Sequence, residues 1–248
     1  MSARRLHLPP ARIAGGRGLL GEEARHYLRD VLRLPAGAAL EVFDGEGGAY
    51  AAELLPGFEA VALGPRREDP PAPAAIWLLL ALARGEKLDL AVQKATELGA
   101  VRIAPFSAER SVVRLEPAKG EERARRWRRI AEEAARQCGR SDVPEVAAPA
   151  TLEDALGSLP PGFGALVFHP GGAPLSELPA APGRGHAAVI GPEGGLTDAE
   201  LLACERAGAR RASLGPRVLR AETAAIVAVA LLQARFGDLR EPAPGGRE

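Results

Sequence analysis

The sequence predicts an α/β protein with a small β-rich N-terminal domain and a larger C-terminal domain built on a mainly parallel sheet. Residues 1–65 contain short extended stretches around one helix, whereas residues 76–236 alternate between apolar strands and helices, as in parallel sheets covered by helices. Between them, the run 65–73 mixes four prolines with charged residues and is expected to be a linker. We therefore predict a first domain at residues 1–70, a second domain at residues 74–240 and a flexible tail at residues 241–248.

The N-terminal part shows three elements. Apolar residues recur at helical spacing over 22–34 and predict a helix. The stretches 40–43 and 50–55 predict two strands that flank a turn at Asp44-Gly45.

The C-terminal part predicts strands and helices in alternation. The expected strands lie at 76–83, 101–106, 165–168, 186–190 and 211–214, and the expected helices at 87–98, 121–138, 197–207 and 222–236. Thr197, with Glu200 three residues later, has the form of a capping box at a helix start. Left-handed glycines are expected just after three helices, at Gly99, Gly139 and Gly208.

A Gly-x-Gly-x-x-Gly string at 16–21, with Asp44 further along, could indicate a dinucleotide-binding turn. That fingerprint requires a buried strand leading directly into the first glycine, and here Pro9-Pro10 and a short extended piece intervene. We therefore expect no dinucleotide site at this position.

Composition limits the function classes. Lys and Arg number 32 and Asp and Glu number 32, so any contact with nucleic acid must come from local clusters of cations. No apolar stretch approaches the ~20 residues that cross a bilayer, and residues 1–12 lack an apolar signal core, so we expect a cytoplasmic protein without a membrane partner. Cys138 and Cys204 form no metal-binding pattern; both are expected to be buried, and no metal is expected.

Two glycine-rich loops follow predicted strands, where ligands collect in open α/β sheets. One is 191–195, in which three glycines leave the main chain bare, and the other is 215–223, which starts the last helix. A single such loop would indicate only a tight turn, but two in succession indicate a small-ligand site. Arg220 and Glu222 stand at the entry to an otherwise apolar helix, which favours a functional role for this charged pair.

The strings VIGPEGGL at 189–196 and LGPRVLRAETA at 214–224 resemble the two signature loops of the ribosomal RNA uridine-N3 methyltransferase family of the SPOUT class. The strings at 87–99, 105–113 and 133–144 agree with that family in the same order, so the resemblance covers about residues 80–237. Residues 26–37 and 42–45 resemble its small N-terminal domain. The chain departs from the family pattern at Ala108, where Thr or Ser is usual, and at Arg136, where an acidic residue is common.

The resemblance implies a C-terminal domain with a deep trefoil knot, an N-terminal PUA-like β-barrel that helps to hold RNA, and a homodimer. It implies S-adenosyl-L-methionine as the cofactor and 16S ribosomal RNA or the small ribosomal subunit as the partner. The residues it nominates for the cofactor are His169, Ile190, Gly191, Pro192, Glu193, Gly194, Gly195, Leu214, Gly215, Val218, Leu219, Arg220 and Thr223.

The predicted helix 121–138 has a cationic side opposite an apolar one. Trp127, Ala131, Ala134 and Cys138 recur at helical spacing on one side. The alternative to an RNA contact is a solvated face on which Glu132 and Glu133 pair with the arginines. The residues nominated for RNA contact, including one from the 105–113 string, are Arg110, Arg125, Arg129, Arg136, Gln137 and Arg140.

For the chemistry, we expect Arg220 to stabilise the anion of a deprotonated uridine ring and Glu222 to accept the proton, to orient Arg220 or only to cap the helix. His169 is expected to line the cofactor loop. Two other functions stay open: a SPOUT ribose 2′-hydroxyl methyltransferase, whose usual Asn-bearing motif is absent from a chain without Asn, and a non-catalytic RNA-binding protein.

Overall fold

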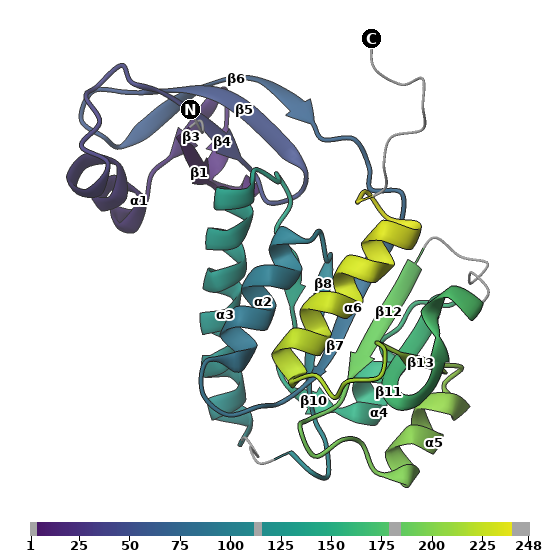
Figure 1. Cartoon of the computed structure of the whole chain (residues 1–248). Coiled ribbons are helices and arrows are strands. Elements are labelled where there is room, and N and C mark those ends of the chain that lie inside the picture. The colour runs from purple at the N-terminus through teal and green to yellow at the C-terminus, as the bar shows by residue number, and fades with distance from the viewer. Residues whose placement is uncertain (1–3, 112–115, 179–184, 240–248) are drawn as a thin grey trace, which may run out of the picture. The chain divides into compact units, whose positions relative to one another are not determined.

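The computed structural model describes residues 4–111, 116–178 and 185–239. It consists of two compact units, the first formed by Met1–Pro71 with Glu132–Val143 and the second by Ala72–Ala131 with Pro144–Glu248 (Figure 1). The segment 132–143 therefore belongs with the N-terminal part, although it follows the first strands of the second unit in sequence. The tail expected at 241–248 lies outside the described residues.

The first unit is a six-stranded, mainly antiparallel sheet with the order β1-β4-β5-β6-β3-β2. Its strands are β1 (Arg5–His7), β2 (Ile13–Ala14), β3 (Arg17–Leu19), β4 (Ala39–Phe43), β5 (Gly48–Leu54) and β6 (Ala60–Glu68). Its short helical elements are η1 (Pro10–Arg12), α1 (Glu22–His26) and the π-helix η2 (Tyr27–Val31). The strands expected at 40–43 and 50–55 are confirmed as β4 and β5, and the helix expected at 22–34 is split between α1 and η2.

The linker expected at 65–73 is wrong over 65–68, because β6 continues through Pro65 to Glu68. The register between β5 and β6 shifts between Tyr50 and Ala52, so Pro65 lies at a bulge. The other edge of β6 pairs with β3 only over Ala60–Ala62. Proline is tolerated at a bulge or a free edge, since no ladder hydrogen bond is lost there.

Asp44, the acid of the possible dinucleotide turn, has a structural function instead. Its carboxylate is buried and accepts hydrogen bonds from the backbone N–H groups of Glu46 and Gly48, each at 2.8 Å, and from Arg66 Nε at 2.9 Å. Burial alone would raise the pKa of Asp44, but these three donors hold it below its ordinary value. The expectation of no dinucleotide site is consistent with this use of the carboxylate.

Arg5 joins the segment 132–143 to the first unit. Its guanidinium is buried and donates from Nε to Glu41 Oε1 at 2.6 Å. It also donates from Nη1 to the carbonyl oxygens of Arg140 at 2.9 Å and Ala135 at 3.3 Å, and from Nη2 to Ser141 Oγ at 3.2 Å. A single buried cation thus binds the end of a helix and the chain that follows it.

The second unit is a parallel sheet of seven strands with the order β10-β8-β7-β12-β11-β13, and β9 pairs with β8. The strands are β7 (Ala75–Ala81), β8 (Arg102–Ser107), β9 (Glu145–Val146), β10 (Ala150–Thr151), β11 (Gly164–Pro174), β12 (Gly185–Ile190) and β13 (Arg210–Ser213). The helices are α2 (Lys87–Glu97), α3 (Pro117–Cys138, whose residues after Ala131 belong to the first unit), α4 (Leu152–Gly157), the 3₁₀ turn η3 (Leu175–Glu177), α5 (Asp198–Arg206) and α6 (Ala221–Phe236). All five expected strands and all four expected helices are confirmed, and the parallel sheet with them.

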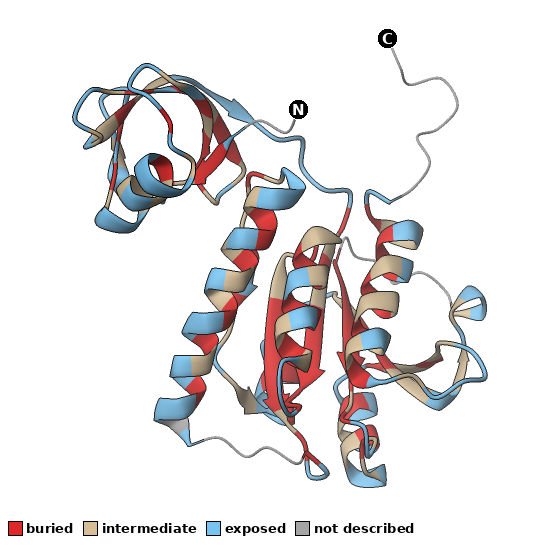
Figure 2. Ribbon diagram, turned by 60° about the vertical axis from the view of Figure 1, so that its left-hand side comes forward, coloured by how far each residue is buried: buried red, intermediate tan, exposed pale blue. Residues whose placement is uncertain are grey.

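Helices cover both faces of this sheet. α2 and α6 pack together, and α6 lies on β7 and β12, whereas α4 and α5 lie on the opposite face (Figure 1). Alternate residues of the central strands therefore face different cores: Leu79 and Val189 pack toward α4 and α5. All six residues of β12 are buried, and Figure 2 shows the central strands as the buried layer of this unit. Such two-sided burial explains why the strands read as continuous apolar runs.

The predicted helix ends are confirmed. Thr197 Oγ1 accepts the N–H of Glu200, and the Glu200 carboxylate accepts the N–H of Thr197 at 2.8 Å, which completes the capping box of α5. Gly99, Gly139 and Gly208 have φ values of 82°, 94° and 86°, the left-handed conformation that ends a helix.

The two cysteines differ. Cys204 is buried as expected, and burial raises its pKa to about 11. The expectation for Cys138 is wrong: it lies exposed in the last turn of α3, with Sγ 3.7 Å from the carbonyl oxygen of Ala135. Among residues 4–111, 116–178 and 185–239, no cluster of three or more His, Cys, Asp or Glu could hold a metal ion. None of the helices described there combines the length and apolarity that crossing a membrane requires.

Replacing Arg5 by Met should lower the free energy of local unfolding around Ser141 by about 3 kcal/mol, since three oxygen acceptors lose their donor and the half-buried Glu41 carboxylate loses the buried one of its two cations. The measurement is amide hydrogen exchange at Gly45 and Val143. The Gly45 N–H donates to the carbonyl oxygen of Ser141, and the Val143 N–H donates to that of Gly45. Arg67→Met is the matched control, because Arg67 pairs with the same Glu41 but is exposed; its loss should cost less than about 1 kcal/mol. Equal effects of the two substitutions would contradict the anchoring role of Arg5.

Candidate functional site

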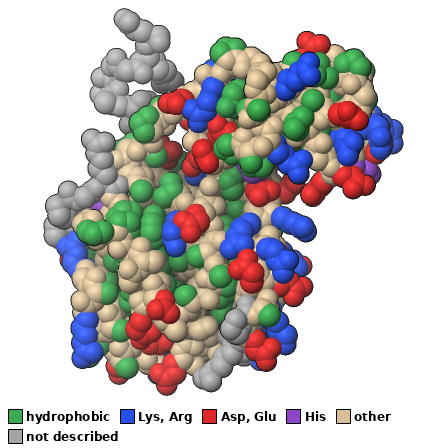
Figure 3. Space-filling view, turned by 180° about the vertical axis from the view of Figure 1, so that it is seen from behind, with side chains coloured by type: hydrophobic (Ala, Val, Ile, Leu, Met, Phe, Trp, Pro, Cys, Tyr) green, Lys and Arg blue, Asp and Glu red, His purple; other side chains and the backbone are tan. Residues whose placement is uncertain are grey.

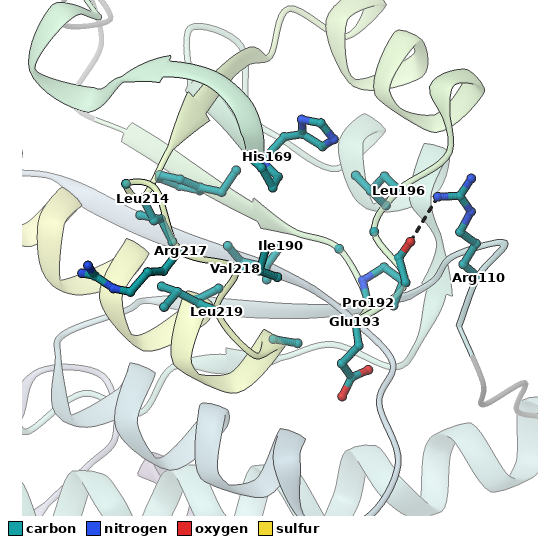
Figure 4. Close-up of a pocket in the computed structure, with 18 residues that line it drawn as sticks. Arg110, His169, Ile190, Pro192, Glu193, Leu196, Leu214, Arg217, Val218 and Leu219 are labelled. Atoms are coloured by element: carbon teal, nitrogen blue, oxygen red, sulfur yellow. Dashed lines mark hydrogen bonds between the residues drawn. The ribbon is translucent and has the colours of Figure 1, made fainter.

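A cavity of about 290 Å³ lies where β11, β12 and β13 lead into their loops (Figure 4). This is the end of a parallel sheet at which ligands bind in open α/β folds. Its walls are mainly apolar, with a few charged side chains at the rim. The residues that line it are Arg110, Phe168, His169, Pro170, Ile190, Gly191, Pro192, Glu193, Gly194, Gly195, Leu196, Leu214, Gly215, Arg217, Val218, Leu219, Ala221 and Ala224.

The structure brings together both glycine-rich loops and the residue after β11 that the sequence nominated. Of the expected cofactor residues, all but Arg220 and Thr223 line this cavity. Sequence reasoning did not nominate Phe168 and Pro170, which flank His169, Leu196 and Arg217, which lie within the two signature strings, or Ala221 and Ala224 in the first turn of α6. Their position beside nominated residues was the available signal for all of them.

The loop after β12 is a tight turn with no room for a side chain at residue 191. Gly195 N–H donates to the Pro192 carbonyl oxygen at 2.8 Å, and Gly195 has φ of 71°. A Cβ on Gly191 would lie 2.9 Å from Leu196 Cγ and 3.2 Å from its backbone nitrogen. Glycine at 191 thus lets the buried Leu196 fold back under the loop, which keeps the main chain bare on the side of the cavity.

Arg110, nominated for RNA, instead reaches this loop. Its Nη1 donates to the carbonyl oxygen of Gly194 at 3.1 Å, shown as the dashed line in Figure 4. The preceding N–H of Glu109 donates to Glu200 Oε1 at 2.8 Å, in the first turn of α5. The turn after β8 is therefore tied both to the cavity loop and to the helix that follows it.

Glu193 points away from the apolar side chains Ile190, Val218 and Leu219 (Figure 4). Its carboxylate accepts a hydrogen bond from Lys87 Nζ in the first turn of α2. That bond, with a backbone hydrogen bond and the charges of Lys87 and Arg220, lowers the pKa of Glu193, so the carboxylate is ionised at neutral pH.

β11 is irregular beside the cavity. Phe168 and Ala173 both pair with Ala212, so residues 169–172 bulge out of the strand. His169 Nδ1 accepts the N–H of Gly171 at 3.1 Å, which holds the bulge closed. A Cβ on Gly172 would lie 2.4 Å from the backbone of Ala212, so only glycine fits this close approach of two main chains.

The loop after β13 carries an exposed apolar tip and then Arg220. Gly215 has φ of 99°, and its N–H donates to Ser213 Oγ at 3.1 Å. Val218 is 83% exposed, although it lines the cavity. Arg220 occupies the N-cap position of α6 without capping it, and its exposed side chain has no hydrogen bond or ion pair with any residue that the structure describes.

Glu222 and Thr223 follow in the first turn of α6, outside the lining of the cavity. Thr223 is exposed. Glu222 Oε2 is buried, and it finds no hydrogen-bond partner among the residues described. A helix start beside buried apolar residues thus carries one exposed cation and one carboxylate oxygen shielded from water.

The arginines of α3 divide into two kinds. Arg125 and Arg129 are exposed and pair with no described residue, whereas Arg136 pairs with Glu133 and stacks 4.3 Å above the ring of Tyr27. For Arg136 the ion-paired alternative therefore describes the arrangement. The face drawn in Figure 3 mixes cationic and anionic side chains, as the zero net charge suggests.

Gln137 and Arg140 follow at the end of the helix. Gln137 is exposed, whereas Arg140 forms a two-pronged ion pair with Asp142, Nε to Oδ1 at 2.9 Å and Nη2 to Oδ2 at 2.5 Å. Ser141 is buried, and its carbonyl oxygen accepts the N–H groups of Gly45 and Gly47. The string 137–143 therefore has a structural function in the first unit.

Comparison with known proteins agrees with this geometry. Residues 70–233 match the RNA methyltransferase domain family, and residues 20–57 match the RNA methyltransferase PUA domain. The ribosomal RNA small subunit methyltransferase E of Synechocystis sp. is 35% identical over 243 residues, which cover 94% of this chain and 78% of that protein.

Two solved structures align over 96% of this chain and 100% of theirs. One is the ribosomal RNA small subunit methyltransferase E of Neisseria gonorrhoeae bound to S-adenosyl methionine, with 31% identity and a TM-score of 0.86. The other is a methyltransferase from Legionella pneumophila with bound cofactor, with 32% identity and a TM-score of 0.87. The predicted α/β fold with an N-terminal PUA domain is confirmed, and the trefoil knot stays a prediction. The chain belongs to the RNA methyltransferase family that includes ribosomal RNA small subunit methyltransferase E.

Proposed function

We propose that this protein transfers a methyl group from S-adenosyl-L-methionine to N3 of a uridine in 16S ribosomal RNA. One observation carries the proposal: the loops at 190–196 and 214–219, which α5 and β13 separate in sequence, line a single cavity at the end of the parallel sheet. Relatives with the same fold include a small-subunit ribosomal RNA methyltransferase that binds S-adenosyl methionine. A site built from bare main chain and apolar walls suits a small cofactor with a flat base.

The residues present fit this cofactor. Aliphatic side chains form walls for an adenine ring, and a Cβ at Gly191 or Gly194 would crowd the loop that borders it. When bound, the cofactor supplies an electrophilic methyl group on a sulfonium. The residues that we propose to hold it are His169, Ile190, Gly191, Pro192, Gly194, Gly195, Leu214, Gly215, Val218 and Leu219, with Glu193, Arg220 and Thr223 at the edge.

Arg220 is the proposed stabiliser of the reacting base. A uridine N3–H becomes a nucleophile when it loses its proton, and the negative charge then spreads onto the two flanking carbonyl oxygens. A guanidinium placed there lowers the barrier by ~3–4 kcal/mol. Arg220 suits this task because it lies between two residues that line the cavity, Leu219 and Ala221, and its exposed side chain has no described partner to neutralise it.

Glu222 is the proposed proton acceptor, or the group that orients Arg220. Its buried Oε2 has no described partner, so one acceptor position is available within two residues of Arg220. Binding both reactants in one orientation contributes a further ~7–11 kcal/mol, since the step becomes effectively unimolecular. The protein therefore supplies alignment, one cation and one acceptor.

For RNA contact we propose Arg125 and Arg129 first, because both are exposed and without a described ion-pair partner. Gln137 is exposed as well, whereas Arg110, Arg136 and Arg140 would have to exchange the partners that they hold. We also propose that the PUA unit helps to hold the RNA, that the second unit contains the knot, and that two chains act as a homodimer in the cytoplasm. The 39% exposure of Leu231 on the apolar helix α6 supports a dimer contact there.

Gly194→Val should weaken S-adenosyl-L-methionine binding at least tenfold, or about 1.4 kcal/mol. A Cβ at this position would already lie 3.3 Å from Arg110 Cβ, and the branched side chain would push the loop out of place. Calorimetry measures the affinity. Gly157→Val is the control, because nothing lies within 4 Å of its Cβ position; a normal affinity in the Gly194 variant would mean that another loop binds the cofactor.

Arg220→Ala should slow methyl transfer to undermethylated small-subunit RNA at least about a hundredfold, because the base anion loses its cation. The free energy of unfolding should stay within about 0.5 kcal/mol of wild type, since the side chain is exposed. Radiolabel transfer gives the rate and urea unfolding the stability. Arg206→Ala, an exposed arginine on α5, is the matched control. Unchanged turnover in the Arg220 variant would remove its proposed role.

A further inference from the structure

Lys87 opens α2, where a cation is locally unfavourable. It is the first residue of the helix, after the N-cap Glu86, whose side chain makes no capping hydrogen bond. The positive end of the helix dipole lies there, so acidic side chains are normally preferred. A lysine that opposes the local preference is a candidate for a function outside the helix.

Lys87 pairs with Glu193 in the loop that borders the cavity. Its ammonium donates to the carboxylate of Glu193, 106 positions along the chain, in the loop that borders the cofactor cavity. Within Gly191-Pro192-Glu193-Gly194-Gly195, Glu193 has the only side chain that can form an ion pair. Both members of the pair are more than a third exposed, so it contributes little to global stability.

The first turn of α2, which carries Lys87, is held in place by α3. Two residues after Lys87, Asp89 accepts a hydrogen bond from the buried Trp127 at 3.0 Å, Nε1 to Oδ1, and a second bond from Arg126. The first turn of α2 is therefore held by α3 while Lys87 reaches the loop. A lysine on a fixed turn defines where the Glu193 carboxylate lies.

A second cation acts on the same carboxylate. The positive charge of Arg220 adds to that of Lys87 in favouring the ionised form of Glu193. Arg220 itself holds no described partner. If Lys87 were absent, Glu193 would be an ionised carboxylate on which the charge of Arg220 still acts, and Arg220 is the residue assigned to the substrate base.

We propose that Lys87 is a positioning residue that holds Glu193 away from Arg220 and so keeps the Arg220 guanidinium available to the substrate. This inference rests on the proposed function of Arg220. It differs from a purely structural role in one respect. The loss of Lys87 slows methyl transfer through the charge of Glu193, so removing that charge should restore the rate.

The test is a double-mutant cycle of Lys87→Met, Glu193→Gln and the two combined, with single-turnover methyl transfer at saturating cofactor and RNA. Lys87→Met should slow transfer about tenfold, and the combined variant should return to within about twofold of Glu193→Gln, a coupling of the size that interacting neighbours show. Lys94→Met is the matched control, because Lys94 pairs with Glu97 on the same helix at 2.8 Å, away from the cavity; it should react like wild type. A combined variant as slow as Lys87→Met would overturn the proposal.

A second readout is independent of activity. In Lys87→Met, hydrogen exchange at Arg220 Nε, followed by NMR, should slow because Glu193 now pairs with that guanidinium, and in the combined variant it should return to the wild-type rate. Unchanged exchange in Lys87→Met would overturn the proposal even for a fully active enzyme. If wild type binds the cofactor but transfers no methyl group while the exchange behaves as expected, the proposed reaction fails and the positioning by Lys87 stands.

Discussion

The parallel pairing of β12 between β7 and β11 is the constraint on which the site depends. His186–Ile190 pairs residue by residue with both neighbours, and every residue of the strand is buried, so its end has one possible position. Parallel strands end at the same edge, which brings Gly191 beside the bulge after Phe168 and the loop after Ser213. A shift of one residue would turn alternate side chains to the wrong core and move the cavity loop with them.

The site also depends on where charged side chains lie around the cavity at this edge of the sheet. The cavity is mostly apolar, and Glu193 is the acidic residue in its lining, with Lys87 and Arg220 acting on it. Methyl transfer to a ring nitrogen needs a free cation more than another acid, because the charge that develops is negative. In our proposal, Lys87 holds the Glu193 carboxylate and so leaves the Arg220 guanidinium available.

The sequence predicted the parts whose signal is local. Apolar runs marked the central strands, and the capping box and left-handed glycines marked helix ends, as found at Thr197 and Gly99. What it could not predict depends on partners distant in the chain: the proline in β6 sits at a bulge, and the segment 132–143 belongs to the first unit through the buried Arg5. The apolar periodicity of α3 likewise could not tell that Cys138 lies beyond the packed part of the helix.

The site shows the same division. Glycines and charges within the two loops were nominated from sequence, whereas Lys87 was not, since nothing local connects it to a loop 106 residues away. The most direct measurement of the central claim is mass mapping of methylated nucleotides after undermethylated 16S ribosomal RNA is treated with the protein and labelled cofactor. One new methyl group on N3 of a single uridine is the expected result. A methyl group on a ribose 2′-hydroxyl, or none in a protein that binds the cofactor, would contradict it.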